Sequence, residues 1–285
     1  MKKSRFRILL LFVCVVLFDV LLLGKIHGKL LANACFSCDN VWENFRAGNV
    51  PEDVMMTFWE ETKDREDFVQ LLTMYFGADG TVKEPELLED ALSFVKQYCK
   101  EDFKTMNRLV ASGWRNLSCF PVGKVRSNPT ASVTFADSWM QSRSFGGERG
   151  HEGCDIMASV NERGIYPIYS VSDGVVENVG WLRLGGYRIG IRSPSGAYFY
   201  YAHLAEYAKE FEVGETVLAG THLGYMGDTG YSDIPGTTGN FPVHLHFGIY
   251  INDENGQELS VNPYPMVLYL WEQQGKYTFG ETKRQ

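Results

Sequence analysis

The chain has 285 residues, of which 45% are hydrophobic and 22% charged, and this balance excludes an intrinsically disordered protein. The formal net charge of -8 argues against nucleic-acid binding, because no cluster of Lys and Arg lies outside the extreme N-terminus. The same charge argues against electrostatic capture of an anionic surface, so partners must be recognised locally. A chain of this length is sufficient for two modest domains.

A basic and then apolar segment opens the chain. The apolar run extends from Ile8 to Leu23, with Asp19 as its one interruption, and four basic residues precede it: Lys2, Lys3, Arg5 and Arg7. This order is typical of a secretory signal peptide or a signal anchor, which we assign to residues 1–34. Ala32-Asn33-Ala34 has the form of a cleavage site but lies well beyond the apolar run, so cleavage stays open. Either reading predicts that the rest of the chain is extracytoplasmic.

The six cysteines are compatible with such a compartment. Cys14 lies in the apolar run and Cys154 lies in a polar motif discussed below. The other four could form two disulfides in any of three pairings, and these are Cys35, Cys38, Cys99 and Cys119. Reduced, buried thiols are the alternative. A zinc or redox role for Cys35 and Cys38 is disfavoured, because the chain has no second CxxC and no thioredoxin-like βαβ pattern.

Residues 35–120 are expected to form a small α-helical module. Pro51 predicts the start of one helix, and apolar residues at helical spacing from Phe68 to Phe76 predict another that ends at Gly77. The module contains no histidine and no evident catalytic cluster. We therefore interpret it as a spacer or as the binding site of a protein partner.

Two further helix boundaries can be proposed within this module. Thr81 and Glu84 have the spacing of a capping box at the start of a third helix. A fourth helix is expected over about 101–111, with Gly113 ending it.

The character of the sequence changes at residue 121. Glycine becomes frequent, and short β-branched or aromatic runs are separated by turn signals such as Asp173-Gly174 and Ser195-Gly196. This pattern predicts a mainly antiparallel all-β domain over residues 121–275, with one helix near 265–271 and a tail at 276–285. The fold class is therefore α+β.

The residues that could carry chemistry lie in three short motifs. The motifs are His151-Glu-Gly-Cys-Asp155, Tyr201-Ala-His203-Leu204 and His244-Leu-His246-Phe247. In a strand His244 and His246 project from the same side, and His151 and Asp155 share a face whether their segment is extended or helical. Two imidazoles and one carboxylate would hold one zinc ion with a fourth position open for water, which is the catalytic form of zinc site. The two remaining histidines would be free for proton transfer.

Two neighbours invite alternative assignments. Glu152 would be the general base of a helical His-Glu-x-x-His site, but Asp155 stands where that motif needs its second histidine, and the surrounding glycines disfavour a helix. Cys154 is a soft ligand type, yet in a strand it points away from the face that His151 and Asp155 share. A small buried side chain is the better interpretation of Cys154. His27 and His222 lack such flanking residues and receive no role.

In this order and with these flanks, the motifs resemble the lysostaphin-type (LytM-like) zinc endopeptidases, which cut peptide cross-links of bacterial peptidoglycan. Further matches lie before and between the motifs: Phe145-Gly146, Arg149, Asp173 to Val176, Gly214 to Gly220 and Leu223 to Gly230. The resemblance covers about residues 140–265. It implies an antiparallel peptidase domain with the zinc site in a cleft on the sheet.

The resemblance also implies a role for each site residue. His151, Asp155 and His246 correspond to the zinc ligands, with one ion per chain, and His203 and His244 to the catalytic histidines. The implied function is hydrolysis of peptidoglycan cross-links by zinc-activated water. Expected partners are stem or cross-bridge peptides in the cell wall and, through the N-terminal segment, the cell membrane; nucleic acid is not expected.

The chain departs from the family pattern in two places. The Gly- and Thr-rich stretch 230–240 before the last motif is longer than usual and is expected to form a loop on the cleft wall. Some members carry a tyrosine shortly before the first zinc histidine that assists the oxyanion, whereas this chain has Phe145 there. Arg149 could hold a substrate carboxylate or could buttress the site.

Two other functions fit the sequence less well than a zinc endopeptidase. The family also contains catalytically inert members that act as cell-wall scaffolds or activate another hydrolase. Inert members typically lack one or more ligand residues, whereas all three are present in this sequence. A zinc carboxypeptidase of cell-wall peptides would require a Glu-x-x-His element, which the chain does not provide.

Overall fold

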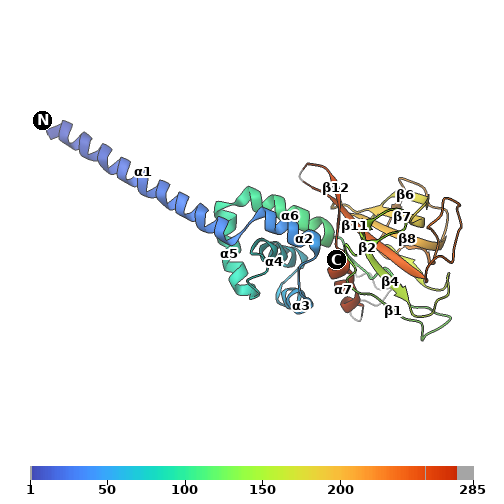
Figure 1. The fold of residues 1–285 in the computed structure, drawn as a ribbon. Helices are drawn as coiled ribbons and strands as arrows, with labels where there is room; N and C mark the ends of the chain where they lie inside the picture. The colour runs from blue at the N-terminus through green and yellow to red at the C-terminus, as the bar shows by residue number, and fades with distance from the viewer. Residues whose placement is uncertain (1, 254, 275–285) are drawn as a thin grey trace.

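The computed structural model describes the backbone of residues 2–253 and 255–274, and side chains from residue 13 onward within those ranges. Its described helices precede and follow a large sheet (Figure 1). They are α1 (Lys2–Cys35), α2 (Cys38–Ala47), α3 (Glu52–Glu61), α4 (Arg65–Gly77), α5 (Pro85–Tyr98), α6 (Lys100–Trp114) and α7 (Tyr264–Gln273). The expected tail at 276–285 lies outside the described residues. A helical module followed by an antiparallel sheet is the arrangement that the sequence predicts.

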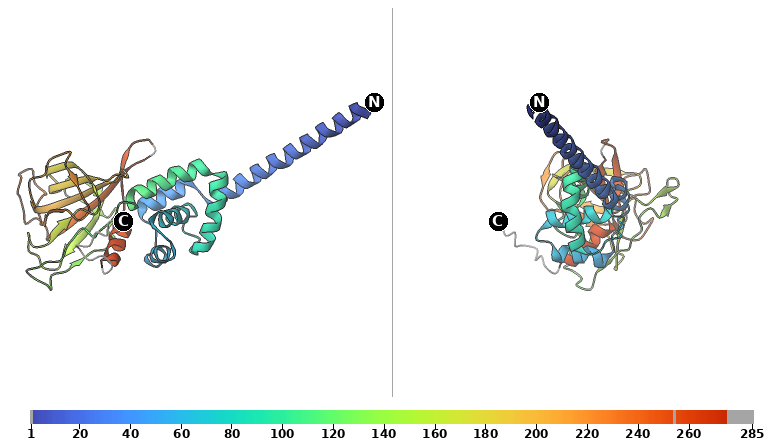
Figure 2. Two further views of the ribbon diagram at one scale, coloured as in Figure 1. Left: turned by 180° about the vertical axis from the view of Figure 1, so that it is seen from behind. Right: turned by 90° about the vertical axis from the view of Figure 1, so that its left-hand side faces the viewer.

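The first helix is a rod that leaves the rest of the molecule (Figures 1 and 2). Near its C-terminal end Gly28 lies against the ring of Tyr98 on α5, where a Cβ would overlap the ring. Within the part of the chain that the structure describes, no helix is both long enough and apolar enough for a membrane crossing. The apolar run of the expected signal peptide or anchor is interrupted by Asp19 and is followed by Lys25. The side chains of the basic residues at the start of this helix lie outside the described part of the chain.

Five helices, α2 to α6, form the module behind this rod. Asp64 caps α4 by accepting hydrogen bonds from the backbone amides of Glu66 and Asp67. The predicted capping box at the start of α5 is wrong: Glu84 is the N-cap residue but makes no side-chain cap hydrogen bond. The hydroxyl of Thr81 instead donates to the carbonyl of Ala78, within the preceding turn.

Gly113 was expected to end the last of these helices, and this prediction is also wrong. The helix α6 continues through Gly113 to Trp114. A Cβ at Gly113 would lie 3.0 Å from Cε of Met266 and 3.2 Å from Cζ of Phe45. The glycine therefore serves the close approach of α6 to α2 and α7 rather than helix termination.

Cys35, Cys99 and Cys119 are in no disulfide in the structure, so none of the three predicted disulfide pairings is formed. The Sγ of Cys99 lies 3.1 Å from Oδ1 of Asn33, and Cys119 donates to the carbonyl of Ser170 at 3.2 Å. Burial raises the pKa of the Cys119 thiol to about 11, so this thiol stays protonated near neutral pH.

The second half of the chain folds into one large antiparallel sheet and a short separate hairpin. The strands are β1 (Val133–Thr134), β2 (Ser142–Arg143), β3 (Arg149–Gly150), β4 (Cys154–Ala158), β5 (Pro167–Tyr169), β6 (Gly174–Leu182), β7 (Gly186–Arg192), β8 (Tyr198–Tyr207), β9 (Thr216–Val217), β10 (His222–Met226), β11 (His244–Asn252) and β12 (Glu258–Val261). The main strand order is β1-β4-β11-β8-β7-β6-β9, with β10 pairing β5 and β8, and β12 pairing β11. β2 and β3 form the hairpin. This order puts β11 between β4 and β8, in the interior of the sheet.

A single hydrophobic core joins the helical module to the sheet domain. The C-terminal helix α7 lies between them (Figure 2, left), and its Tyr269 ring lies 5.0 Å from Trp59, 5.9 Å from Phe68 and 5.7 Å from Trp114. Aromatic side chains of the helical module therefore help to form the core around α7.

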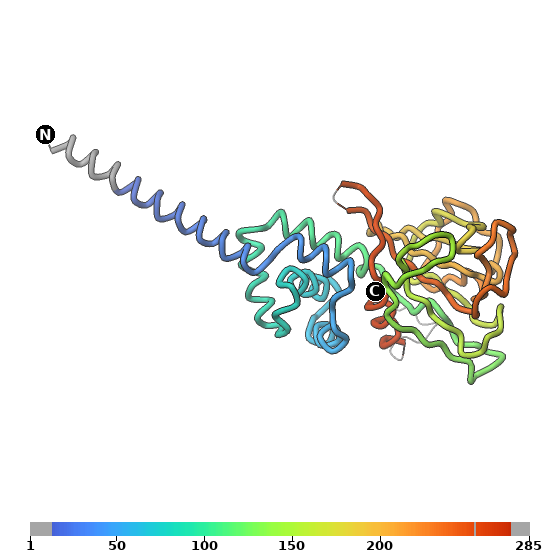
Figure 3. The backbone as a smooth tube through the Cα atoms, viewed as in Figure 1, coloured from blue at the N-terminus to red at the C-terminus, as the bar shows by residue number. Residues whose placement is uncertain are grey.

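A buried amide makes a second connection between the two regions. The Nδ2 of Asn262 donates to the carbonyl of Ala47 at 2.9 Å, and it also lies 3.2 Å from Oδ2 of Asp137. Asn262 follows β12 directly, and its own backbone amide donates to the carbonyl of Arg46. The C-terminal end of α2 is thereby fixed to the segment that precedes the first histidine motif. Figure 3 shows the chain passing from the helical module to the sheet domain.

Candidate metal centre

The first and last histidine motifs meet because β4 pairs with β11. The register places His246 opposite Asp155, and His244 opposite Met157. As the sequence predicts, alternation along β11 sends His244 and His246 to the same face. His151 lies in the turn between β3 and β4, where Gly153 allows the chain to reverse close to β11.

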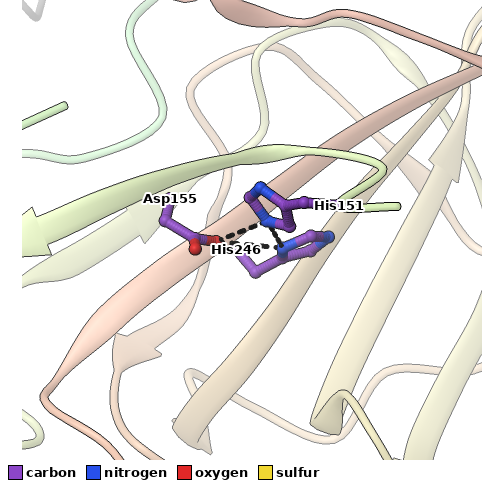
Figure 4. Close-up of side chains that lie close together, drawn as sticks. All are labelled: His151, Asp155 and His246. Carbon is purple, nitrogen blue, oxygen red and sulfur yellow. Dashed lines mark hydrogen bonds and ion pairs between the residues drawn. The ribbon is translucent and has the colours of Figure 1, made fainter. Parts of the chain in front are cut away.

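Three side-chain atoms of types that can bind a metal converge at this point (Figure 4). Nε2 of His151 lies 3.0 Å from Oδ1 of Asp155 and 3.0 Å from Nδ1 of His246, and the Asp155 to His246 distance is 3.1 Å. Ligand atoms at about 2.0–2.1 Å from a tetrahedral zinc ion would be roughly 3.3 Å apart. The observed triangle is therefore within a few tenths of an ångström of one face of such a site.

The ring of His151 is held in the orientation that a metal ligand needs. Its Nδ1 lies 2.9 Å from the hydroxyl and 3.1 Å from the carbonyl oxygen of Ser138. A carbonyl can only accept, so Nδ1 carries the proton, and Nε2 presents its lone pair to the cluster. No spacing rule identifies Ser138 from the sequence alone.

Arg143 orients the carboxylate of Asp155. Its Nη2 donates to Oδ2 at 3.1 Å, which leaves Oδ1 to face His151 and His246. Burial alone would raise the pKa of Asp155, but hydrogen bonds and charge interactions with the surrounding histidines outweigh it and hold the pKa well below its usual range. Asp155 is thus ionised at any pH at which the protein would bind a metal.

Gly153 makes room for the third ligand. A Cβ at this position would lie 2.6 Å from Nε2 of His246, so any other residue would push the ring out of place. Burial lowers the pKa of His246, with Asp155 acting in the opposite direction, and the imidazole is neutral as a ligand requires.

His203 reaches the cluster through a distortion of β8. Its φ of 64° is in the left-handed region, and the pairing of β7 with β8 changes register between Tyr187 and Ile189. Nδ1 of His203 donates to the carbonyl of Thr229 at 2.8 Å, so Nε2 is the unprotonated nitrogen. Burial, with His244 and His246 nearby, lowers the pKa of His203 well below its usual value.

His244 is anchored in a similar way. Its Nδ1 donates to the carbonyl of Pro242 at 2.8 Å, and its Nε2 lies 3.8 Å from Oδ1 of Asp155. Its ring centroid is 4.7 Å from that of His203. Two imidazoles, each with its Nδ1 proton held by a backbone carbonyl, therefore stand side by side next to the three ligand atoms.

These side chains open into a cavity of about 510 Å³, which Tyr231 also lines. Tyr231 comes from the 230–240 stretch, and its ring is stacked on Phe145 with centroids 4.2 Å apart. The same ring lies edge-on to His203 at 6.1 Å. Some family members have a tyrosine where this chain has Phe145. The long loop of this chain brings Tyr231 next to that position.

Glu152 and Cys154, the neighbours of His151 and Asp155 in the first motif, lie as the sequence predicts. Glu152 is exposed and belongs to no helix, and Cys154 is fully buried, with its Sγ 3.9 Å from the carbonyl of Ala136. Burial raises the pKa of Cys154 further from a ligand's range. His27 on α1 is exposed, and His222 on β10 bonds the carbonyl of Gly224, so neither is near the cluster.

A twisted antiparallel sheet with a His-Asp-His cluster and two further histidines in one cavity defines a metallopeptidase-type site. The family model for peptidase family M23 matches residues 149–263. A solved structure from Ruminococcus gnavus, assigned as a glycyl-glycine endopeptidase lytM, is 40% identical and covers 80% of this chain and 90% of its own, with a TM-score of 0.68. The chain belongs to peptidase family M23.

Curated relatives match part of this chain. The L-Ala--D-Glu endopeptidase of Bacillus subtilis is 45% identical over 139 residues, which are 49% of this chain and 40% of the relative. Lysostaphin of Staphylococcus simulans is 33% identical over 104 residues, 36% of this chain and 18% of the relative. The chain therefore spans less than half the length of the curated relatives that it matches.

Proposed function

We propose that the protein is a zinc-dependent endopeptidase that hydrolyses peptide cross-links of bacterial peptidoglycan. The observation that carries this proposal is the triangle of His151 Nε2, Asp155 Oδ1 and His246 Nδ1, with edges of 3.0–3.1 Å. The donor set of two neutral imidazoles and one carboxylate suits zinc and leaves a coordination position for water. Relatives named as endopeptidases support the reaction class.

Zinc, when bound, supplies Lewis acidity that lowers the pKa of a coordinated water and polarises a carbonyl. The chain's own residues handle the proton. Nε2 of His203 or His244 accepts it as the water oxygen bonds to the carbonyl carbon, and the resulting imidazolium returns it to the nitrogen of the breaking peptide bond. Because burial lowers the pKa of His203, its ring is in the accepting form at neutral pH.

The backbone carbonyls of Thr229 and Pro242 contribute orientation. Each accepts the Nδ1 proton of one imidazole at 2.8 Å, which directs Nε2 of His203 and His244 toward the ligand cluster. When either ring is protonated during the reaction, it can also stabilise the negative oxygen of the tetrahedral intermediate. The rings need no large rearrangement for this, since they are already in contact.

The names of relatives suggest two bonds as substrates, L-Ala--D-Glu bonds and glycine bridges. An experiment can identify which of them this protein cleaves. Purified protein is incubated with isolated sacculi, with and without a chelator, and the soluble products are identified by mass spectrometry. We expect peptide products that disappear on chelation and return with added zinc. Intact sacculi at every zinc level would refute the enzymatic proposal and favour a catalytically inert scaffold or activator.

The location of the protein follows from its substrate. Peptidoglycan lies outside the cytoplasmic membrane, so we propose that residues 1–34 direct the chain across it, either as a cleaved signal or as an anchor. Cell fractionation with an antibody against the sheet domain tests this, and a cytoplasmic protein would contradict it.

A further inference from the structure

The cavity extends well beyond the metal ligands along the face of the sheet. At its far end it is lined by Tyr198 and Tyr200 of β8, Tyr250 of β11 and Arg188 of β7. The ring of Tyr200 lies 5.9 Å from that of His246 and 6.4 Å from that of Tyr250, so the tyrosines begin directly beside a metal ligand. This end of the cavity has no part in the hydrolytic mechanism proposed above.

Glycines on β7 and in the turn before it allow this arrangement. A Cβ at Gly190 would overlap the hydroxyl of Tyr198, and a Cβ at Gly185 would overlap that of Tyr200. The two tyrosine side chains can therefore lie flat across the neighbouring strand and point toward β7. Arg188 stands on β7 between these two glycines.

Arg188 differs from Arg143 and Arg192, whose guanidinium groups are paired with carboxylates. Arg143 pairs with Asp155 at 3.1 Å, and Arg192 bonds both Glu177 and Glu258 at 2.6 Å. The guanidinium of Arg188 makes no ion pair and no side-chain hydrogen bond with any residue that the structure describes, and its Nη1 is closed off from solvent without an acceptor. A sequestered cationic nitrogen of this kind is unfavourable until an anion reaches it.

The hydroxyls nearby are hydrogen-bond donors. Burial raises the pKa values of Tyr200 and Tyr250, so both phenols stay protonated at neutral pH. The Tyr198 hydroxyl accepts from Nδ2 of Asn178 at 3.3 Å, whereas that of Tyr200 has no hydrogen-bond partner in the described part of the chain. A carboxylate beside Arg188 would find a second donor in Tyr200.

The acidic residues of the cavity do not satisfy this arginine. Glu258 is engaged by Arg192, and Asp155 is engaged by Arg143 and the metal-site histidines. Glu152 is exposed to solvent and within the described residues has no ion pair with Arg188. The far end of the cavity therefore carries an uncompensated positive charge, in a protein whose formal net charge is -8.

We propose that Arg188, assisted by Tyr200, is a carboxylate-binding subsite through which the enzyme selects peptides with an acidic residue next to the cleaved bond. The guanidinium presents parallel N–H donors that match a carboxylate in a bidentate geometry. Arg149 adds a second cation, which lines the same cavity and acts on Tyr250 through its charge. This inference rests on the proposed peptidase function and adds its substrate class.

The spacing of the strands fixes where the acidic residue must be. β7 is two strands away from β11, which is about 10 Å, and an extended peptide advances about 3.3 Å per residue. Because the side chains of both arginine and the acidic residue shorten this gap, the carboxylate belongs to a residue one or two positions from the scissile bond. A free carboxylate far along the peptide would not reach.

The test compares two peptides that differ in one group, Ala-Glu and Ala-Gln peptides with blocked ends, each with L and D configuration at the second residue. We expect the wild-type protein to prefer the carboxylate over the carboxamide by about tenfold to a hundredfold in kcat/KM, mainly through KM. In Arg188→Gln the ratio should fall to about one, and in Arg188→Lys to an intermediate value. Arg183→Gln is the matched control, because Arg183 is exposed and pairs only with the exposed Asp233.

A second readout is independent of catalysis. Binding of the same peptides to chelator-treated wild-type, Arg188→Gln and Arg183→Gln proteins is measured by calorimetry, after thermal melts confirm that each variant is folded. Loss of the carboxylate preference in Arg188→Gln alone supports the subsite. Equal losses for both peptides, or an unchanged ratio, would overturn it. Cleavage of sacculi without any carboxylate preference would reject the subsite but not the peptidase function. A carboxylate preference in binding without cleavage would reject the peptidase function but not the subsite.

Discussion

The helical module and the sheet domain share one hydrophobic core but differ in the number of polar residues that they bury. In α2 to α6 only Thr73 and Ser112 are buried polar residues, whereas eleven others lie in the sheet domain and α7. Helices satisfy their backbone internally, so their buried faces can be almost entirely apolar. The sheet domain instead has bulges and turns whose backbone carbonyls hold side chains such as His203 and His244. Chemistry is therefore found where the backbone is irregular.

The strongest test of this comparison removes one ligand from the sheet domain. His246→Ala deletes a nitrogen of the triangle, and we expect activity on sacculi to fall by at least about 10³-fold, because both the metal and the oriented histidines act through this site. Zinc content measured by mass spectrometry should fall with it. His222→Ala, a histidine of the same domain outside the cavity, should retain both; a variant His246→Ala with full activity would show that this nitrogen is not a ligand.

The two anchored histidines provide the next test. His203→Asn and His244→Ala should lower kcat by about 10²–10⁴-fold while zinc stays bound. Asparagine is chosen at 203 because it tolerates the left-handed backbone there better than alanine. If either variant loses its zinc instead, that histidine belongs among the ligands.

The helical module should respond in stability rather than in chemistry. Phe68 is 1% exposed and packs against Trp59, Trp114 and Tyr269. Phe68→Ala should lower the free energy of unfolding by about 3–5 kcal/mol and Tm by roughly 10 °C. Turnover of the folded protein at low temperature should stay within about twofold of the wild type; a large fall there would break the division between the two regions. Phe68→Leu, which keeps most of the volume, should lose much less stability.

A smaller effect is expected from the residue that orients Asp155. Arg143→Gln should weaken zinc affinity by about 10–100-fold, as changes in the partners of metal ligands typically do. Competition with a chelator of known affinity measures this. Arg126→Gln, at an exposed arginine of the same domain, is the control and should leave the affinity unchanged.

The smallest effect concerns a pair of charges away from the cavity. The hydrogen bond from Arg192 lowers the pKa of Glu177 in the folded state. A lowered folded pKa stabilises the protein above the unfolded pKa of the carboxyl, and this stabilisation is lost as pH falls through the folded value. Because the Glu177 side chain is 40% exposed, we expect about 0.5 kcal/mol. The Tm gap between wild type and Glu177→Gln should therefore close between about pH 6 and about pH 3; a gap that widened would contradict the pairing.

The sequence could predict what depends on local period and order. The alternation that puts His244 and His246 on one face, the buried position of Cys154 and the helix near 265–271 all follow from residue spacing. Gly77 also ends its helix as predicted. The order of the three motifs was enough to indicate which side chains should meet.

What could not be predicted depends on contacts between distant segments. Arg143, Ser138 and Thr229 hold site residues through geometry that no local spacing encodes. Gly113 looked like a helix end because its packing partner Met266 lies far along the chain. Tyr231 has a φ of 53° and stacks on Phe145, which lies far from it in the sequence. A tyrosine close to residue 145 in the sequence was the expected one, and the chain has none there.

The amide of Asn262 gives the peptidase domain a boundary that differs from its sequence boundary. It bonds Ala47 at the end of α2 and Asp137, one residue before the serine that holds His151. Ser195 on the sheet side likewise bonds Ser112 and Asn116. A fragment cut near residue 121 would expose these groups and the aromatic surface around Tyr269. We therefore expect that a fragment must begin before α2 to keep His151 rigid, and that a protease that cuts the α6 to β1 connection leaves two pieces that stay together.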